Sequence, residues 1–108
     1  MALAWQSSAW VDVGDEQGAV VLRVGGELDE ASRSAVEPAV MAAVQSASHV
    51  ILDLGSLTFC DSSGIAMIVQ AAETARQRDC RIAVDHATPT VRRIFDIANL
   101  GEIVDLRQ

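Results

Sequence analysis

The residues of greatest chemical interest form the run Cys60-Asp61-Ser62-Ser63-Gly64, where two adjacent hydroxyl groups follow a carboxylate. An apolar stretch ends just before this run, and a helical pattern begins inside it. Asp or Ser at such a junction caps a helix by accepting hydrogen bonds from backbone N–H groups. A helix N-terminus also carries partial positive charge, which tolerates a phosphate on Ser62. The run therefore leaves two interpretations open, a plain helix cap and a phosphorylation site.

A catalytic serine is a third interpretation. A nucleophilic Ser62 would need a base held in place by a further group, and His86 follows about two dozen residues later. The run lacks the G-x-S-x-G pattern of a nucleophile elbow, and no glycine-rich oxyanion loop accompanies it. His49 and His86 flank predicted strands, where we expect solvated loop residues. We therefore expect no enzymatic activity from this chain.

Metal and cofactor sites are not expected either. The sequence has no H-x-x-x-H, HExxH, EF-hand or Walker A pattern. The pair Gly25-Gly26 lacks dinucleotide-binding spacing and is expected to serve a turn or bulge. Cys60 and Cys80 do not form a C-x-x-C pair, so we expect two reduced cysteines in or near the core, which suits a reducing cytosol.

Composition limits the possible partners. The chain has 15 acidic and 8 basic side chains, a net charge of -7, which argues against a nucleic-acid surface or a polybasic membrane contact. No apolar run approaches the ~20 residues of a membrane span, and the N-terminus does not resemble a signal peptide. We expect a cytoplasmic protein with a single domain over residues 1–108, in which residues 1–8 form a loosely ordered segment.

The first half of the chain predicts a hairpin and a helix. Val11 and Val13 alternate with polar residues, and residues 19–24 form a β-branched run, so two strands should flank a loop over residues 14–18. This loop is not a two-residue type, which leaves the strand register open. Helical spacing covers residues 31–46, and Asp29 or Ser32 is a candidate N-cap. Pro38 implies a kinked helix over that range, although its regular part could instead start near Glu37.

The second half alternates strands and helices. We expect a strand at 49–54, a linking segment, a helix at 63–77, a strand at 80–85, a helix starting at Pro89 and ending before Gly101, and a strand at 102–106. Thr88 is the candidate N-cap of the last helix. The order β-β-α-β-α-β-α-β predicts an α/β fold whose mixed, mainly parallel sheet begins with an antiparallel hairpin.

Three segments carry a resemblance to a known family. They are "VVLRVGGELDEASRSAV" at 20–36, "HVILDLGSLTFCDSSGIAMIVQA" at 49–71 and "PTVRRIFDIANLGEIVDL" at 89–106. With these segments the chain resembles a STAS domain, and within that family the stand-alone bacterial anti-anti-sigma factors. The resemblance extends over about residues 9–106 and implies the STAS fold.

The resemblance also implies a mechanism. In such proteins the unphosphorylated antagonist binds an anti-sigma factor that is also a GHKL-type serine kinase, and the sigma factor is freed. The kinase phosphorylates the first serine of the D-S-S-G motif, here Ser62, and a PP2C-type phosphatase resets it. Asp61, Ser63 and Gly64 would lie at the partner contact, and Asp29 would approach it from the loop before the first helix.

Other STAS domains imply an alternative role. Members of the family also serve as scaffolds of stress-signalling complexes or as accessory subunits of lipid transport systems, without a phosphorylation switch. In such a role the D-S-S-G segment would be only a helix cap. The family commonly has a larger apolar residue where this chain has Cys60, which leaves a redox role there open, and whether Ser63 is a secondary acceptor is also open.

Overall fold

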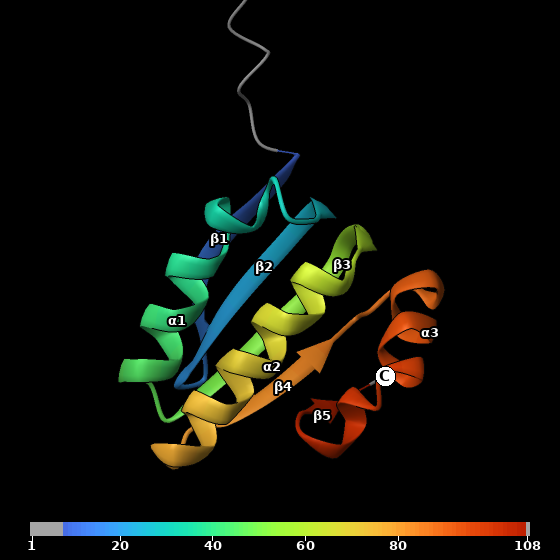
Figure 1. Cartoon of the computed structure of the whole chain (residues 1–108). Coiled ribbons are helices and arrows are strands. Elements are labelled where there is room, and N and C mark those ends of the chain that lie inside the picture. The colour runs from blue at the N-terminus through green and yellow to red at the C-terminus, as the bar shows by residue number, and fades with distance from the viewer. Residues whose placement is uncertain (1–7, 108) are drawn as a thin grey trace, which may run out of the picture.

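The computed structural model describes residues 8–107 of the chain. In these residues five strands form one sheet in the order β1-β2-β3-β4-β5. The strands are β1 (Ala9–Glu16), β2 (Ala19–Leu28), β3 (His49–Cys60), β4 (Arg81–Asp85) and β5 (Asp105–Leu106). β1 runs antiparallel to β2, and the other neighbours are parallel (Figure 1). The predicted α/β class, element order and N-terminal hairpin are therefore confirmed.

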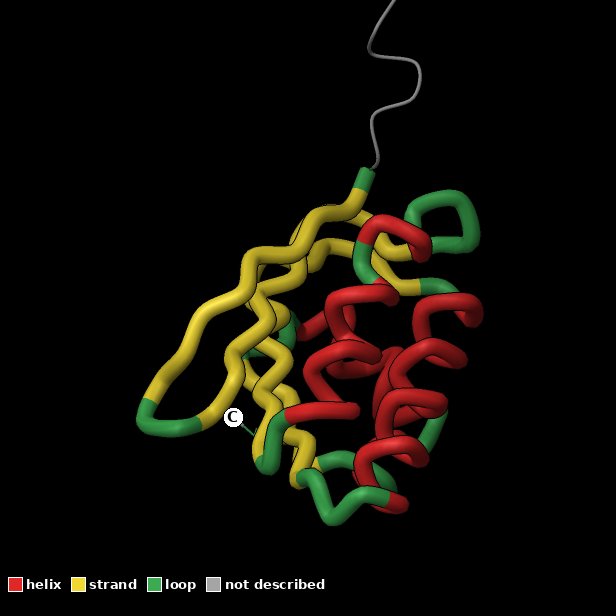
Figure 2. Tube along the Cα trace, turned by 90° about the vertical axis from the view of Figure 1, so that its left-hand side faces the viewer, coloured by secondary structure: helices red, strands yellow, loops and turns green. Residues whose placement is uncertain are grey.

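The helices of the described region pack on one face of the sheet. They are α1 (Glu37–Ser46), α2 (Ser62–Gln77) and α3 (Pro89–Ile97), with short 3-10 helices η2 (Arg33–Ala35) and η3 (Leu100–Glu102). Figure 2 shows the strands along one side of the molecule and the helices along the other. Large apolar side chains fill the space between these two layers; among them are Leu22, Leu52, Leu54, Met67, Ile68 and Phe95. No helix within residues 8–107 is long and apolar enough to span a membrane.

The β1–β2 hairpin is tighter than the sequence suggests. The strands extend to Glu16 and restart at Ala19, so the turn consists of Gln17 and Gly18 alone. Both turn residues have positive φ, 53° and 88°, which is typical of the two-residue type I′ turn that fits the twist of paired strands. The prediction of a longer loop over residues 14–18 was therefore wrong.

β2 and β3 are longer than predicted and reach the end of the molecule that carries the D-S-S-G run. Their register shifts around Gly25 and Gly26, where Gly26 has a φ of 86°. This bulge confirms the expected role of the glycine pair. Beyond it Leu28 pairs with Cys60, so the predicted linking segment after residue 54 is in fact strand.

The first helix begins later than the favoured prediction. Residues 33–35 form η2, and the regular helix α1 starts at Glu37 with Pro38 in its first turn. A proline is tolerated there because the first N–H groups of a helix have no intrahelical partner. The kinked helix over residues 31–46 was therefore wrong, and the alternative start near Glu37 is confirmed.

The C-terminal elements are shorter than predicted. Thr88 caps α3 by accepting a hydrogen bond from the Val91 N–H at 3.3 Å, as expected. α3 ends at Ile97 because Asn99 takes a left-handed conformation, with φ 58°. Gly101 consequently lies inside η3, and the last strand covers only residues 105–106 instead of 102–106.

The prediction for residues 1–8 falls outside the described residues except at Ser8. The Ser8 carbonyl accepts a hydrogen bond from the Glu27 N–H at 2.9 Å, and its hydroxyl donates to the Glu27 carbonyl at 3.2 Å. Ser8 is therefore tied to β2.

Candidate functional site

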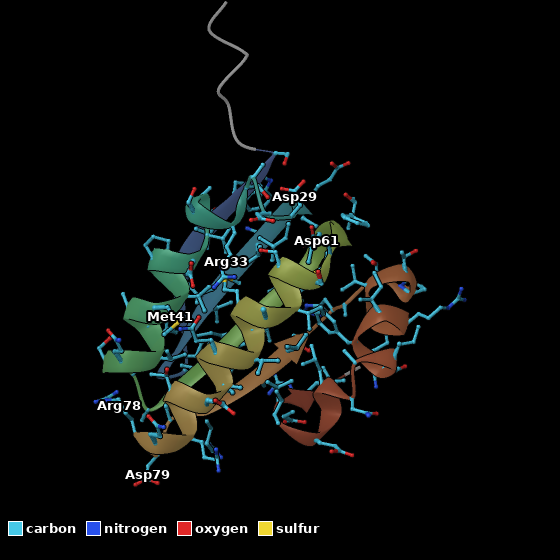
Figure 3. The ribbon with its side chains drawn as sticks, viewed as in Figure 1. Asp29, Arg33, Met41, Asp61, Arg78 and Asp79 are labelled. Atoms are coloured by element: carbon cyan, nitrogen blue, oxygen red, sulfur yellow. The ribbon has the colours of Figure 1, made fainter. Side chains whose placement is uncertain are left out.

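The candidate site lies where β2 and β3 end and α2 begins. The Asp61 N–H donates a hydrogen bond to the Leu28 carbonyl at 3.0 Å, which joins the two strand ends. Residues 28–32 and 60–64 therefore meet at this point, as the labels of Asp29 and Asp61 in Figure 3 show. The expected approach of Asp29 to the D-S-S-G run is present.

Asp61 is the N-cap of α2. Its Oδ1 accepts hydrogen bonds from the Ser63 N–H at 2.8 Å and the Gly64 N–H at 3.1 Å. The Asp61 backbone is extended, with φ -95°, as a capping residue requires. The cap is therefore Asp61, and Ser62 is left free of that task.

The two serines differ in their surroundings. Ser62 is exposed at the first position of α2, and within residues 8–107 its hydroxyl makes no hydrogen bond. Ser63 is half-buried; its N–H is bound by Asp61, and its carbonyl accepts a hydrogen bond from Arg33 Nη1 at 3.4 Å. Ser62 is thus open to solvent, whereas Ser63 is partly covered.

Gly64 lets α2 lie directly on the strand ends. It is buried, and a methyl group at its Cα would lie 2.6 Å from Cys60 Sγ and 3.0 Å from the Leu28 side chain. Its function in the fold is this close approach.

The loop that carries Asp29 is fixed by a buried serine. Asp29 Oδ1 accepts a hydrogen bond from the Ser32 N–H at 2.9 Å, and Ser32 Oγ accepts one from the Asp29 N–H at 3.0 Å. Ser32 Oγ also donates to the Glu27 carbonyl at 2.7 Å. The candidate caps Asp29 and Ser32 thus bond to each other, and the prediction that one of them caps the first helix was wrong, because the N-cap of α1 is Val36. The half-exposed Asp29 keeps a defined position beside α2.

Arg33 is the residue that sequence reasoning missed. It pairs with Glu37 at 2.8 Å and also reaches α2 through Ser63 and Gln70. The hydrogen bond from Arg33 lowers the pKa of the Glu37 carboxyl, and the same bond raises the pKa of Arg33. The four-residue spacing of Arg33 and Glu37 was a visible signal for their pairing, but nothing local signalled the contact with α2.

The histidines do not lie where a serine hydrolase would need them. His86 lies beside Gly55, whose added methyl would be 3.5 Å from the His86 Cβ, and its Nδ1 is 3.3 Å from Asp53 Oδ1. Five residues of strand, roughly 16 Å, separate Gly55 from Cys60 next to the site. His49 is farther still, at the other end of β3. Neither can act as the base for Ser62. No metal-ligand cluster is present among the described residues either.

Both cysteines are free and buried, as predicted. Burial, with a smaller contribution from Asp61, raises the pKa of the Cys60 thiol to about 12, and burial also raises that of Cys80. Because the thiolate is the reactive form, both thiols should be inert in the folded protein.

We expect an aromatic disulfide reagent at pH 8 to modify the native protein slowly, and both thiols rapidly in urea. The measurement is the release of the coloured thiol over time. A Cys60→Ala variant assigns the two phases. Rapid reaction of Cys60 in the native protein would contradict the burial argument and would revive a redox role.

The chain is similar to known proteins along most of its length. The family model described as "Mlab, STAS domain" matches residues 11–106. The chain is 29% identical over 98 residues to an anti-sigma F factor antagonist of Paenibacillus polymyxa, with 89% of this chain and 84% of that protein covered. It is 25% identical over 88 residues to an anti-sigma-B factor antagonist of Staphylococcus epidermidis, with 81% of this chain and 82% of that protein covered.

A solved structure agrees in fold. The crystal structure of an anti-sigma factor antagonist from Mycobacterium paratuberculosis matches with a TM-score of 0.84 at 27% sequence identity, and the match covers 92% of this chain and 85% of that one.

Proposed function

The chain belongs to the STAS domain family, and on that premise we propose that it is an anti-sigma factor antagonist switched off by phosphorylation of Ser62. The observation that carries the proposal is the exposed, unbonded Ser62 hydroxyl on a helix whose first N–H groups Asp61 already caps. A serine needed only as a cap would have its oxygen engaged in that hydrogen bonding.

In the proposed cycle the unmodified protein binds an anti-sigma factor and so frees the sigma factor. The partner is also a GHKL-type serine kinase. It transfers the γ-phosphoryl group of ATP: a bond forms between the phosphorus and Ser62 Oγ, the bond to the bridging oxygen breaks, and ADP leaves while a base of the kinase takes the hydroxyl proton. A PP2C-type phosphatase then adds water to the phosphorus, releases inorganic phosphate and restores the serine. Because ATP is the donor, the cycle belongs to the cytoplasm.

The site can carry the phosphate without unfolding. The positive end of α2 favours a negative group at its first turn. A docked partner, in contrast, meets about two added negative charges on a surface where the Asp29 and Asp61 carboxylates already lie. Binding is therefore lost while the domain keeps its fold.

We propose that the partner contacts this same end of the molecule. Asp29, Asp61 and Ser63 are each half-exposed around Ser62, and Gly64 beneath them sets how close α2 lies to the strands. Phe59 is 44% exposed on the strand that leads into the site. A large exposed aromatic beside polar groups is a common anchor of protein interfaces.

The test is a pull-down of this chain from its native cell with and without ATP, followed by intact-mass and peptide mass spectrometry. We expect a GHKL-type kinase in the bound fraction and an ATP-dependent single phosphate on Ser62. A stable scaffold or lipid-transport partner with Ser62 unmodified would overturn the proposal in favour of the alternative STAS roles.

A further inference from the structure

Arg33 lies beside the helical turn that carries Ser62, although it is about 30 residues away in sequence. Figure 3 shows Arg33 between the ribbons of α1 and α2, on the side of Asp61 and Asp29. Its Nη1 donates to the Ser63 carbonyl at 3.4 Å, and its Nη2 donates to Gln70 Oε1 at 3.3 Å. The Arg33 guanidinium thus contacts Ser63, the residue next to the proposed acceptor Ser62.

The contacts of Arg33 differ in quality. Nε and Nη2 donate to the two carboxylate oxygens of Glu37 at 3.0 and 2.8 Å, a bidentate pair. The contacts with Ser63 and Gln70, at 3.4 and 3.3 Å, are longer than the usual range of about 2.7–3.2 Å. The guanidinium is therefore held mainly by Glu37, and the two side chains are 27% and 29% exposed. Because both side chains remain partly in solvent, water screens the attraction between them.

A phosphate on Ser62 would compete with Glu37 for this cation. The Cα atoms of Ser62 and Ser63 are about 3.8 Å apart, and the phosphate extends further from Ser62 Oγ. It offers up to two negative charges and three acceptor oxygens, against one charge on the Glu37 carboxylate. Arginine presents a planar fork that suits a phosphate at least as well as a carboxylate.

We propose that Arg33 is the internal receptor of the Ser62 phosphate, and that phosphorylation moves its guanidinium from Glu37 to the phosphate. This rests on the proposed function only in that Ser62 is the residue that becomes phosphorylated. The movement leaves Glu37 as a bare carboxylate between α1 and α2. The partner then meets a second change in surface charge besides the phosphate itself.

Other charges at the site act on the same groups. Glu30 supports the charged form of Arg33, and Asp29 and Asp61 lie at the same end as the phosphate. These carboxylates raise the second pKa of a phosphate on Ser62, whereas Arg33 lowers it. A comparison must therefore keep all three acids unchanged and vary only the Arg33–Glu37 pair.

The test uses full-length protein with phosphoserine inserted at position 62 during synthesis, so no kinase is needed. The first readout is the carboxyl-carbon NMR titration of Glu37. In the unmodified protein Arg33 lowers the pKa of this carboxyl. We expect phosphorylation to raise it toward the ordinary value, and to raise it less in an Arg33→Gln protein, where only the direct repulsion by the phosphate acts.

The second readout is the phosphorus NMR titration of the phosphate. We expect its second pKa to be higher by about 0.5 in Arg33→Gln than in the unsubstituted phosphoprotein. Glu37→Gln should lower that pKa, because it removes both a nearby negative charge and the competitor of the phosphate for Arg33. Arg92→Gln is the matched control, since Arg92 is in an i,i+4 pair with Asp96 on α3 and not with Glu37, and it should change the value less than Arg33→Gln does.

An equal rise of the Glu37 pKa in the unsubstituted and Arg33→Gln phosphoproteins would overturn the proposal, as would a phosphate pKa that is the same in Arg33→Gln and Arg92→Gln. If Arg33→Gln does not fold, the Glu37 titration in proteins that keep Arg33 still decides the matter: a Glu37 pKa that stays low after phosphorylation overturns the proposal. Because the phosphoserine is inserted directly, a negative result here leaves the kinase switch standing. A failed kinase pull-down likewise leaves this measurement valid.

Discussion

A Ser62→Ala protein is expected to take up no phosphate from the partner kinase, whereas a Ser63→Ala protein takes up one phosphate per chain, as the unsubstituted protein does. The Ser62 hydroxyl is exposed and unbonded, while Ser63 is half-buried and contacted by Arg33 through its carbonyl. The measurement is intact mass after incubation with the kinase and ATP. Phosphate on Ser63 in the Ser62→Ala protein, at the rate seen for Ser62, would contradict this assignment.

The same substitution separates binding from release. Ser62→Ala should bind the partner equally with and without ATP, while ATP releases the unsubstituted protein.

Ser62→Asp should weaken binding by about tenfold or more, since like charges facing each other in an interface cost several kcal/mol. An aspartate at this helix end should leave the fold intact and stabilise it by about 0.3 kcal/mol. Equal affinity of Ser62→Asp and unsubstituted protein, measured by calorimetry, would disprove charge exclusion.

The start of α2 was predictable because its signals are local. The Asp-Ser-Ser-Gly run placed the cap and the first turn within one residue of the structure, and a cap needs only neighbours along the chain. The same holds for Thr88 and Pro89 at the start of α3. The alternation of strands and helices was sufficient to predict a mainly parallel sheet.

The end of β3 could not be predicted in the same way. Gly55 and Ser56 have the composition of a loop, yet residues 55–60 become strand because β2 pairs with them beyond its bulge at Gly25 and Gly26. That pairing depends on a partner some 30 residues away, as does the contact of Arg33 with α2. Sequence periodicity carries no information about such long-range contacts, so the D-S-S-G run was placed at a helix start but the cation beside it was missed.

Gly64→Ala is expected to destabilise the protein by about 1–3 kcal/mol, the usual cost of overpacking a filled core. At an unobstructed helical position the same change stabilises by up to about 1 kcal/mol. Here the new methyl would lie 2.6 Å from Cys60 Sγ and 3.0 Å from Leu28 Cδ2 and Cγ, so α2 must move away from the strand ends. The measurement is urea unfolding followed by circular dichroism.

A double-substitution cycle tests whether the cost comes from that contact. Cys60→Ala alone should cost about 1 kcal/mol for the space it leaves, and in the Gly64→Ala/Cys60→Ala protein the new methyl occupies that space. The double variant should then be more stable than the sum of the single effects predicts, by about 1 kcal/mol. Gly101→Ala is the control, because its added methyl would meet Leu106 at an ordinary 3.5 Å. Strict additivity would contradict the packing argument. Because the displaced turn carries Ser62, Gly64→Ala should also slow phosphorylation, and Cys60→Ala should restore part of the rate.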